Sequence, residues 1–239
     1  MDGTAIPAIK DALPSTRITD SISKAQKVVS VSAATGRSLP MVQALLKKCN
    51  LKDPCILSGG TEIINPLNFN ILWEVRLSKH QVTKIIEVCN PYPYEVFFSD
   101  EVKGLPARNK IQTGSERIVY VKDCKMDDAK KIQKDLMKMN DIAAHFAGSW
   151  TQGRVDIHIT HISATKKHAV DQLIKILHVE KKEVLVVGDT SNDVPLFESA
   201  GFRVAMGNAT DDLKQKADYI APSVEEDGLA HVIETFILS

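Results

Sequence analysis

Carboxylate and amide side chains cluster at the end of an apolar segment, residues 184–193. The apolar run ends at Gly188 and is followed by Asp189, and then by Asn192 and Asp193. This pattern predicts a buried parallel strand whose carboxyl end presents oxygen ligands in a crevice. Mg²⁺ prefers such ligands and completes its shell with water and phosphate oxygens. The same residues also fit a polar strand-to-helix turn in which Asn192 or Asp193 caps the helix.

Three other short segments carry side chains that suit phosphate chemistry. They are Asp2-Gly3-Thr4, Thr35-Gly36-Arg37 and Lys166. A hydroxyl and backbone N–H groups after a strand can bind a phosphoryl oxygen, and a lysine that opens a helix can neutralise phosphate charge. Each segment also has a structural alternative. Thr35 could cap the following helix, Lys166 could be a solvated first-turn lysine, and Asp2 could be a disordered terminal acid.

Strand and helix patterns alternate near both ends of the chain. Strands are expected at 28–34, 54–58, 183–187, 202–206 and 219–221, and helices at 39–49, 168–177, 195–200, 211–216 and 229–238. This alternation predicts an α/β fold with a doubly wound, Rossmann-like parallel sheet. All four candidate segments then lie at strand ends or helix starts of that sheet.

The middle of the chain has a different pattern. Its expected strands, 71–77, 95–99, 118–121 and 154–159, alternate partly between apolar and polar residues, with helices expected at 80–88 and 127–139. Such strands favour an antiparallel sheet with one solvated face. We therefore expect a core domain of residues 1–60 and 157–239, with an α+β module inserted at 61–156. The loop 100–113 is expected to be exposed.

The composition is that of an ordinary globular protein. Hydrophobic residues make up 44% and charged residues 25%, and 30 basic residues balance 30 acidic ones. This balance gives no electrostatic footprint for nucleic acid or an anionic membrane, and no stretch approaches the ~20 apolar residues of a membrane span. The start of the chain lacks a signal-peptide pattern, and the four cysteines form no CxxC pair. A reduced, cytoplasmic protein is expected. The oligomeric state is not predicted.

In this order, the segments resemble the motifs of the haloacid dehalogenase superfamily, specifically its Cof-like branch of sugar-phosphate phosphatases. Three motifs match: Thr35-Gly36-Arg37, Lys166 and the Gly-Asp-x-x-Asn-Asp sequence at 188–193. The similarity continues through 204–209, 217–219 and 226–229, and so covers the α/β block from end to end. The resemblance implies that residues 61–156 form a cap domain over a hydrolase core.

The resemblance implies a Mg²⁺-dependent phosphatase that transfers the phosphoryl group to an aspartate and then to water. Asp2 would be the general acid and base and would offer its backbone carbonyl to Mg²⁺. Thr35, Gly36, Arg37 and Lys166 would bind the phosphoryl group. Asp189 would be the main metal ligand, with Asp193 completing or supporting the shell. Asn192 would either join that shell or contact phosphate.

The first family motif, Asp-x-Asp-Gly-Thr, is only partly present. Met1 stands at its second position, so the position of the nucleophilic aspartate precedes the sequence, together with the apolar strand that would carry it. We expect that the sequence starts at an internal Met of a longer protein. The alternative is a catalytically inactive relative, or one that uses another carboxylate.

Two other functions remain open on these residues. One is a sugar phosphomutase, and the other is a non-catalytic phosphosugar-binding or regulatory protein. The phosphorylated substrate itself is not predicted. Cations of the inserted module could meet an anionic substrate; they are Arg108, Lys110, Arg117 and Arg154. His158 and His161 are interpreted as strand residues without a catalytic role.

Overall fold

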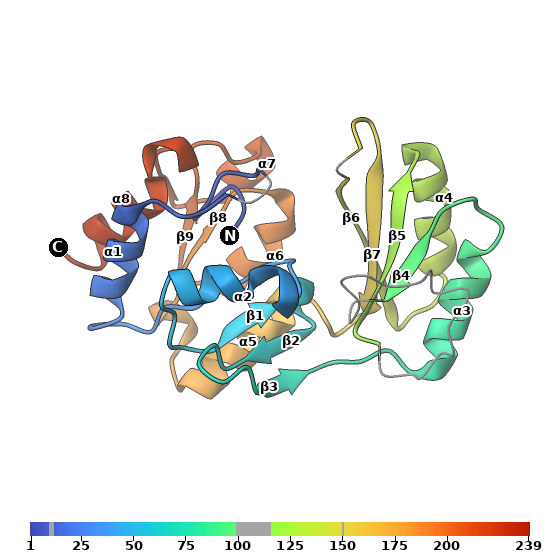
Figure 1. The fold of residues 1–239 in the computed structure, drawn as a ribbon, viewed down its shortest axis with the longest axis horizontal. Helices are drawn as coiled ribbons and strands as arrows, with labels where there is room; N and C mark the ends of the chain where they lie inside the picture. The colour runs from blue at the N-terminus through green and yellow to red at the C-terminus, as the bar shows by residue number, and fades with distance from the viewer. Residues whose placement is uncertain (10–11, 99–115, 150) are drawn as a thin grey trace. The chain divides into compact units, whose positions relative to one another are not determined.

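The computed structural model describes residues 1–9, 12–98, 116–149 and 151–239, which form two compact units (Figure 1). The core unit comprises Met1–Trp73 and Lys166–Ser239, and the inserted unit comprises Glu74–Thr165. These boundaries differ from the expected 61 and 156, because residues 62–64 pair with a core strand and the last inserted strand continues to His161. The expected loop 100–113 lies outside the described residues.

Helices and strands of the core unit follow the expected order. The helices are α1 (Thr16–Ala25), α2 (Leu39–Lys48), α5 (Lys166–Leu177), α6 (Val194–Phe197), α7 (Asp211–Lys214) and α8 (Gly228–Phe236). The strands are β1 (Cys55–Leu57), β2 (Glu62–Ile64), β3 (Ile71–Glu74), β8 (Leu185–Gly188), β9 (Phe202–Ala205) and β10 (Tyr219–Ile220). Helix α1 and strand β2 were not predicted. Helix α1 buries few apolar side chains, and Ser15 caps it by accepting a hydrogen bond from the backbone N–H of Ile18.

The core strands form two sheets, one of which is parallel. Strands β8, β9 and β10 pair in parallel, with Leu185 opposite Phe202, whereas β1 and β2 form an antiparallel pair. The mixed α/β fold is confirmed, but the doubly wound parallel sheet describes only part of it. The expected strand 28–34 is wrong, because among the described residues this segment pairs only through an isolated parallel bridge from Ala34 to Ile56.

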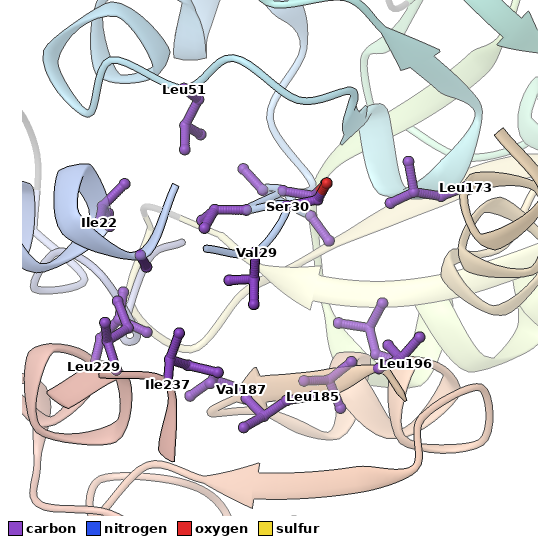
Figure 2. A pocket seen from close by; sticks show the side chains of 18 of the residues that line it. Ile22, Val29, Ser30, Leu51, Leu173, Leu185, Val187, Leu196, Leu229 and Ile237 are labelled. Carbon is purple, nitrogen blue, oxygen red and sulfur yellow. The ribbon is translucent and has the colours of Figure 1, made fainter. Parts of the chain in front are cut away.

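A large apolar cavity separates the two core sheets (Figure 2). Its volume is about 600 Å³, and its lining includes residues 28–34 on one side and residues 184–187 of the β8 segment on the other. Unfilled core cavities cost about 24 cal/mol per Å³, so an empty cavity of 600 Å³ would cost about 14 kcal/mol. That is as large as the whole stability of a typical domain. The segment 28–34, which has almost no strand pairing among the described residues, is thus also one wall of the cavity.

The inserted unit is a four-stranded antiparallel sheet with two helices on one face (Figure 1). Its strands are β4 (Val96–Phe98), β5 (Ile118–Cys124), β6 (Ile142–Gly148) and β7 (Val155–His161), in the order β4-β5-β7-β6, and its helices are α3 (Lys79–Cys89) and α4 (Met126–Leu136). The predicted antiparallel sheet is confirmed. Strand β6 was not predicted, since its alanines have low strand propensity, and it is held by pairing with β7 along its whole length.

All four cysteines of the chain are free and buried. Burial raises the pKa of the Cys55 thiol to about 12. Within the described part of the chain, none of the helices has the length and apolar character that a membrane crossing requires.

The helix-free face of the inserted sheet carries a row of ring side chains. Tyr120 stands opposite His158, which stands opposite His145, and the Tyr120 and His158 rings meet edge to face at 4.7 Å. Burial lowers the pKa of His158 to about 4, assisted by the charge of Lys122 and by His145 and opposed by Asp156. His158 is therefore neutral in the folded protein at pH 6, where an unfolded histidine is partly protonated.

This difference predicts acid sensitivity of the inserted unit. A folded pKa below the unfolded value means that stability falls as the pH drops from about 6.5 towards 4, by roughly 2 kcal/mol for His158. The variant His158→Gln should lose less of its thermal stability between pH 7 and pH 4.5 than the unmodified protein. The matched control is His80→Gln, which changes an exposed histidine on α3. Equal acid sensitivity of both variants would contradict the assignment.

Candidate active site

The amino-terminal turn packs directly on the end of β8. Gly3 has a φ of 68°, a conformation that favours glycine, and the Thr4 hydroxyl donates a hydrogen bond of 2.8 Å to Oδ1 of Asp189. A Cβ atom added to Gly3 would lie 2.1 Å from Oδ2 of Asp189. Only glycine therefore allows this turn to lie against the carboxylate.

Asp193 links the end of β8 to the first residue of α5. Its Oδ1 lies 2.5 Å from the Lys166 ammonium nitrogen, and the two side chains are only 9% and 13% exposed. Its Oδ2 accepts a hydrogen bond of 3.1 Å from the backbone N–H of Asp189. A Cβ atom on Gly188 would lie 2.7 Å from Cβ of Asp193, so Gly188 makes room for this side chain. Both oxygens of Asp193 are thus engaged within the protein.

The two carboxylates after β8 have opposite pKa shifts. Burial raises the pKa of Asp189, and the Thr4 hydrogen bond only partly offsets this effect. Burial acts on Asp193 in the same sense, but the Lys166 charge and hydrogen bond outweigh it and lower the pKa of Asp193. The Lys166 ammonium group neutralises the charge of Asp193. Asp189 has no cationic side chain hydrogen-bonded to it among the described residues. A bound cation would stabilise the charged form of Asp189.

The Thr35 segment is joined to Asp2 through an arginine. Thr35 is buried, and its Oγ1 accepts a hydrogen bond of 3.1 Å from the backbone N–H of Arg37. The Arg37 guanidinium binds both carboxylate oxygens of Asp2, with Nε 3.0 Å from Oδ2 and Nη2 on Oδ1. Gly36 is exposed, and a Cβ there would meet nothing within 4 Å. A ligand can therefore approach this turn.

A single connected network thus contains most of the predicted site residues. It runs through Thr35, Arg37, Asp2, the Gly3-Thr4 turn, Asp189, Asp193 and Lys166. Asn192 is exposed, and the structure gives its side chain no hydrogen bond to another described residue. The sequence prediction thus identified the members of this network, and Asn192 lies outside it.

Asn208 is a structural member of the site that the sequence analysis did not single out. Its Nδ2 donates a hydrogen bond of 2.9 Å to the carbonyl oxygen of Gly3, and its Oδ1 accepts a hydrogen bond of 2.9 Å from the backbone N–H of Val224. Asn208 therefore fixes the turn that faces Asp189. The available signal was its place in the segment 204–209, which already resembled the family.

The donor set of the network suits a hard cation with an incomplete protein shell. Among the described residues, no three His, Cys, Asp or Glu side chains come together as a metal cluster. Asp189 supplies carboxylate oxygens, and the amino-terminal turn lies against it. Mg²⁺ is commonly held by one or two carboxylates and otherwise by water and phosphate oxygens. The residues present fit such an ion. Asp193 binds the Lys166 ammonium group, so Asp189 is the carboxylate left for the ion.

Two of the other predicted cations and histidines, Arg117 and His161, make contacts within the inserted unit. Arg117 forms an ion pair with Glu74 at 3.2 Å, and Nδ1 of His161 accepts a hydrogen bond from the backbone N–H of Ser163. Arg108 and Lys110 lie outside the described residues.

Comparison with known proteins places these features in a family. The family model described as haloacid dehalogenase-like hydrolase matches residues 1–233. The 5-amino-6-(5-phospho-D-ribitylamino)uracil phosphatase YwtE of Bacillus subtilis is 31% identical over 139 residues, or 57% of this chain and 46% of that protein. A second phosphatase of the same compound from Bacillus subtilis, YcsE, is 27% identical over 221 residues, or 89% of this chain and 84% of that protein.

Similarity extends to solved structures and differs in extent among relatives. The structure of the subclass IIB sugar phosphatase BT4131 superposes with a TM-score of 0.79 at 19% identity, covering 99% of this chain and 96% of that one. The matches to the first three curated relatives span only 46%, 36% and 58% of their lengths.

The buried Lys166–Asp193 pair predicts an asymmetric mutational response. Lys166→Met leaves a buried carboxylate without its counter-charge and should lower the free energy of unfolding by about 3 kcal/mol. The double variant Lys166→Met/Asp193→Asn should recover part of that loss, because no unpaired charge remains. Urea denaturation of the three proteins measures both values.

Lys167→Met is the matched control, since its pair with Asp171 is about 40% exposed and should contribute less than about 1 kcal/mol. An equal loss in Lys166→Met and Lys167→Met would show that the buried pair has no special weight.

Proposed function

Because the chain belongs to the haloacid dehalogenase-like hydrolase family, we propose that it forms the phosphate and Mg²⁺ site of a phosphatase. Its substrates would be small phosphorylated metabolites, sugar phosphates among them, cleaved through an aspartyl-phosphate intermediate. The observation that carries the proposal is the connected network from Thr35 to Lys166. It joins an exposed turn at Gly36, a lysine and the Asp189 carboxylate, to which no cationic side chain of the described residues donates a hydrogen bond.

Each group of the network has a role in this reaction. Lys166, the Thr35 hydroxyl and the exposed Gly36 turn would hold the phosphoryl oxygens, and Asp193 keeps the Lys166 ammonium group in position. Asp189 would bind Mg²⁺ together with the backbone carbonyl of Asp2. The ion would offset negative charge on the phosphoryl oxygens. Asn208 and Gly3 keep the amino-terminal turn against Asp189.

Asp2 would handle protons in this reaction. The Arg37 guanidinium holds both of its oxygens, and a carboxylate at this place would activate water. Donation of a proton to the leaving oxygen requires the acid form, so Asp2 would loosen from Arg37 when substrate binds. Its side chain is 39% exposed, which leaves room for that change.

The attacking carboxylate is not among these groups. Asp2 is held by Arg37, Asp193 is held by Lys166, and Asp189 is assigned to the ion. A protein that binds phosphate esters without hydrolysing them is therefore the second candidate function, and it predicts the same binding without turnover.

The substrate class is supported by the relatives' names. YwtE and YcsE are named as phosphatases of a phosphorylated ribityl compound, and BT4131 as a sugar phosphatase. These substrates share a phosphate ester on a sugar or polyol chain. We further propose that the inserted unit, residues 74–165, acts as the cap that selects the group attached to phosphate.

The site predicts Mg²⁺-dependent binding of the reaction product, orthophosphate. Isothermal titration calorimetry should detect phosphate binding in the presence of Mg²⁺ and at least tenfold weaker binding with EDTA, as expected for loss of about 1.4 kcal/mol or more. Asp189→Asn should abolish the Mg²⁺ dependence.

Asp212→Asn is the control, since Asp212 is exposed on α7 and bonds only to nearby groups such as Ser191. Phosphate binding that is insensitive to both EDTA and Asp189→Asn would refute the proposed site.

A further inference from the structure

The turn that joins β1 to β2 contacts the Gly36 turn of the candidate site through the backbone. The backbone N–H of Ser58 donates a hydrogen bond of 2.9 Å to the carbonyl of Arg37. The backbone N–H of Gly59 donates a hydrogen bond of 3.0 Å to the carbonyl of Thr35. Both residues that flank Gly36 are therefore held by the turn after β1.

These contacts do not engage the N–H group of Gly36. This group has no hydrogen-bond acceptor among the described residues, and Gly36 is exposed. Backbone N–H groups presented by a turn can bind an anion such as phosphate. Because its two neighbours are held by residues 58 and 59, the place of Gly36 depends on how firmly those two residues are fixed.

Ser58 has a backbone conformation that serine rarely adopts. Its φ is 51°, in the left-handed region, and Gly59 and Gly60 follow with φ values of 73° and 105°. Glycine adopts this region without strain, whereas a residue with a Cβ atom does not. Position 58 nevertheless carries a side chain, which is buried. Backbone strain of this kind is a reason to ask what the side chain contributes.

The Ser58 side chain is bound to a buried carboxylate. Its hydroxyl donates a hydrogen bond of 2.8 Å to Oε1 of Glu62, the first residue of β2. Glu62 stands opposite Leu57 in the β1–β2 ladder and is only 3% exposed. A carboxylate is unfavourable in such a place unless hydrogen bonds satisfy it. The hydroxyl thus supports the carboxylate, and the carboxylate holds the strained serine in place.

A simpler turn would join the two strands equally well. Glycine at position 58 would adopt the same backbone without strain, and an apolar residue at position 62 would match the fully buried Ile63 and Ile64 that follow it. The chain instead places two unfavourable side chains in contact where the turn meets the candidate site. Local exceptions of this kind are expected where a functional site is held in position.

We propose that Ser58 and Glu62 are positioning residues of the phosphate site. Their buried hydrogen bond fixes the backbone N–H groups of residues 58 and 59. These N–H groups hold the carbonyls on both sides of Gly36 and so keep its N–H available to a phosphoryl oxygen. Neither Ser58 nor Glu62 touches the phosphoryl group itself. The inference rests on the proposed function in naming phosphate as the ligand of the turn.

The test measures orthophosphate binding by calorimetry, with Mg²⁺ present, in single variants of the full chain. Ser58→Gly keeps the left-handed backbone and removes the hydroxyl, and Glu62→Leu removes the acceptor. Both should weaken phosphate binding by about tenfold, the scale on which residues behind a ligating group act. Glu62→Gln keeps an oxygen that accepts the hydrogen bond and should stay within about threefold of the unmodified protein.

Thr61→Val is the matched control in the same turn. The Thr61 hydroxyl is buried and has no hydrogen-bond partner among the described residues, so its removal should leave phosphate binding unchanged. Equal weakening by Thr61→Val and Ser58→Gly would overturn the proposal, because any change in the turn would then suffice. Unchanged binding in Ser58→Gly, or an equal loss in both Glu62 variants, would also overturn it.

Hydrogen exchange separates this inference from the proposed function, because it needs no ligand. The N–H of Thr35 donates to the carbonyl of Ile56, and the N–H of Arg37 donates to the Thr35 hydroxyl oxygen. Both amides should exchange at least about tenfold faster in Ser58→Gly and Glu62→Leu, with no change in Glu62→Gln and Thr61→Val.

The two readouts together assign any failure. Faster exchange in the two disruptive variants, with no phosphate binding by the unmodified protein, would keep the support of the Gly36 turn and refute the phosphate site. Unchanged exchange in both variants would overturn the positioning role, even where the unmodified protein binds phosphate.

Discussion

The buried ion pair between Lys166 and Asp193 is the interaction on which the core unit depends most. Lys166 is the first residue after the inserted unit, so the pair fixes the point where the chain returns to the core. The same carboxylate accepts the N–H of Asp189 and so shapes the turn after β8. Its charge is neutralised by Lys166, and the neighbouring Asp189 is thereby left as the carboxylate that can serve an external cation. One buried pair thus positions the chain and separates the roles of two aspartates.

The apolar cavity and the active site belong to the same construction. Both rims of the cavity run into site residues, Thr35 on one side and Asp189 on the other. The candidate site and the cavity are neighbours because the carboxyl ends of parallel strands meet at one edge of a sheet.

The sequence alone was sufficient to predict most helices and most strands, and most of the candidate site residues that it singled out lie in one hydrogen-bonded network. Residues 188–193, 35–37 and Lys166 have types and spacing that few other functions share, and they were found without coordinates. Long apolar periodicities such as α2 and α5 were equally clear. Weakly apolar elements were missed: α1 buries only one narrow stripe, and the alanines of β6 form a strand because β7 supplies a partner.

The sequence by itself determined which residues are candidates to bind phosphate and a cation, because that choice depends on side-chain chemistry and on motif order along the chain. Tertiary structure decided which of these residues contact one another. Asp193 pairs with Lys166, Arg37 binds the Asp2 carboxylate, and Asn208 donates a hydrogen bond to the carbonyl of Gly3. It also decided that residues 28–34 remain unpaired on one edge. Those outcomes depend on distances between segments far apart in the chain, and pairing and burial at such distances are not encoded in any local pattern.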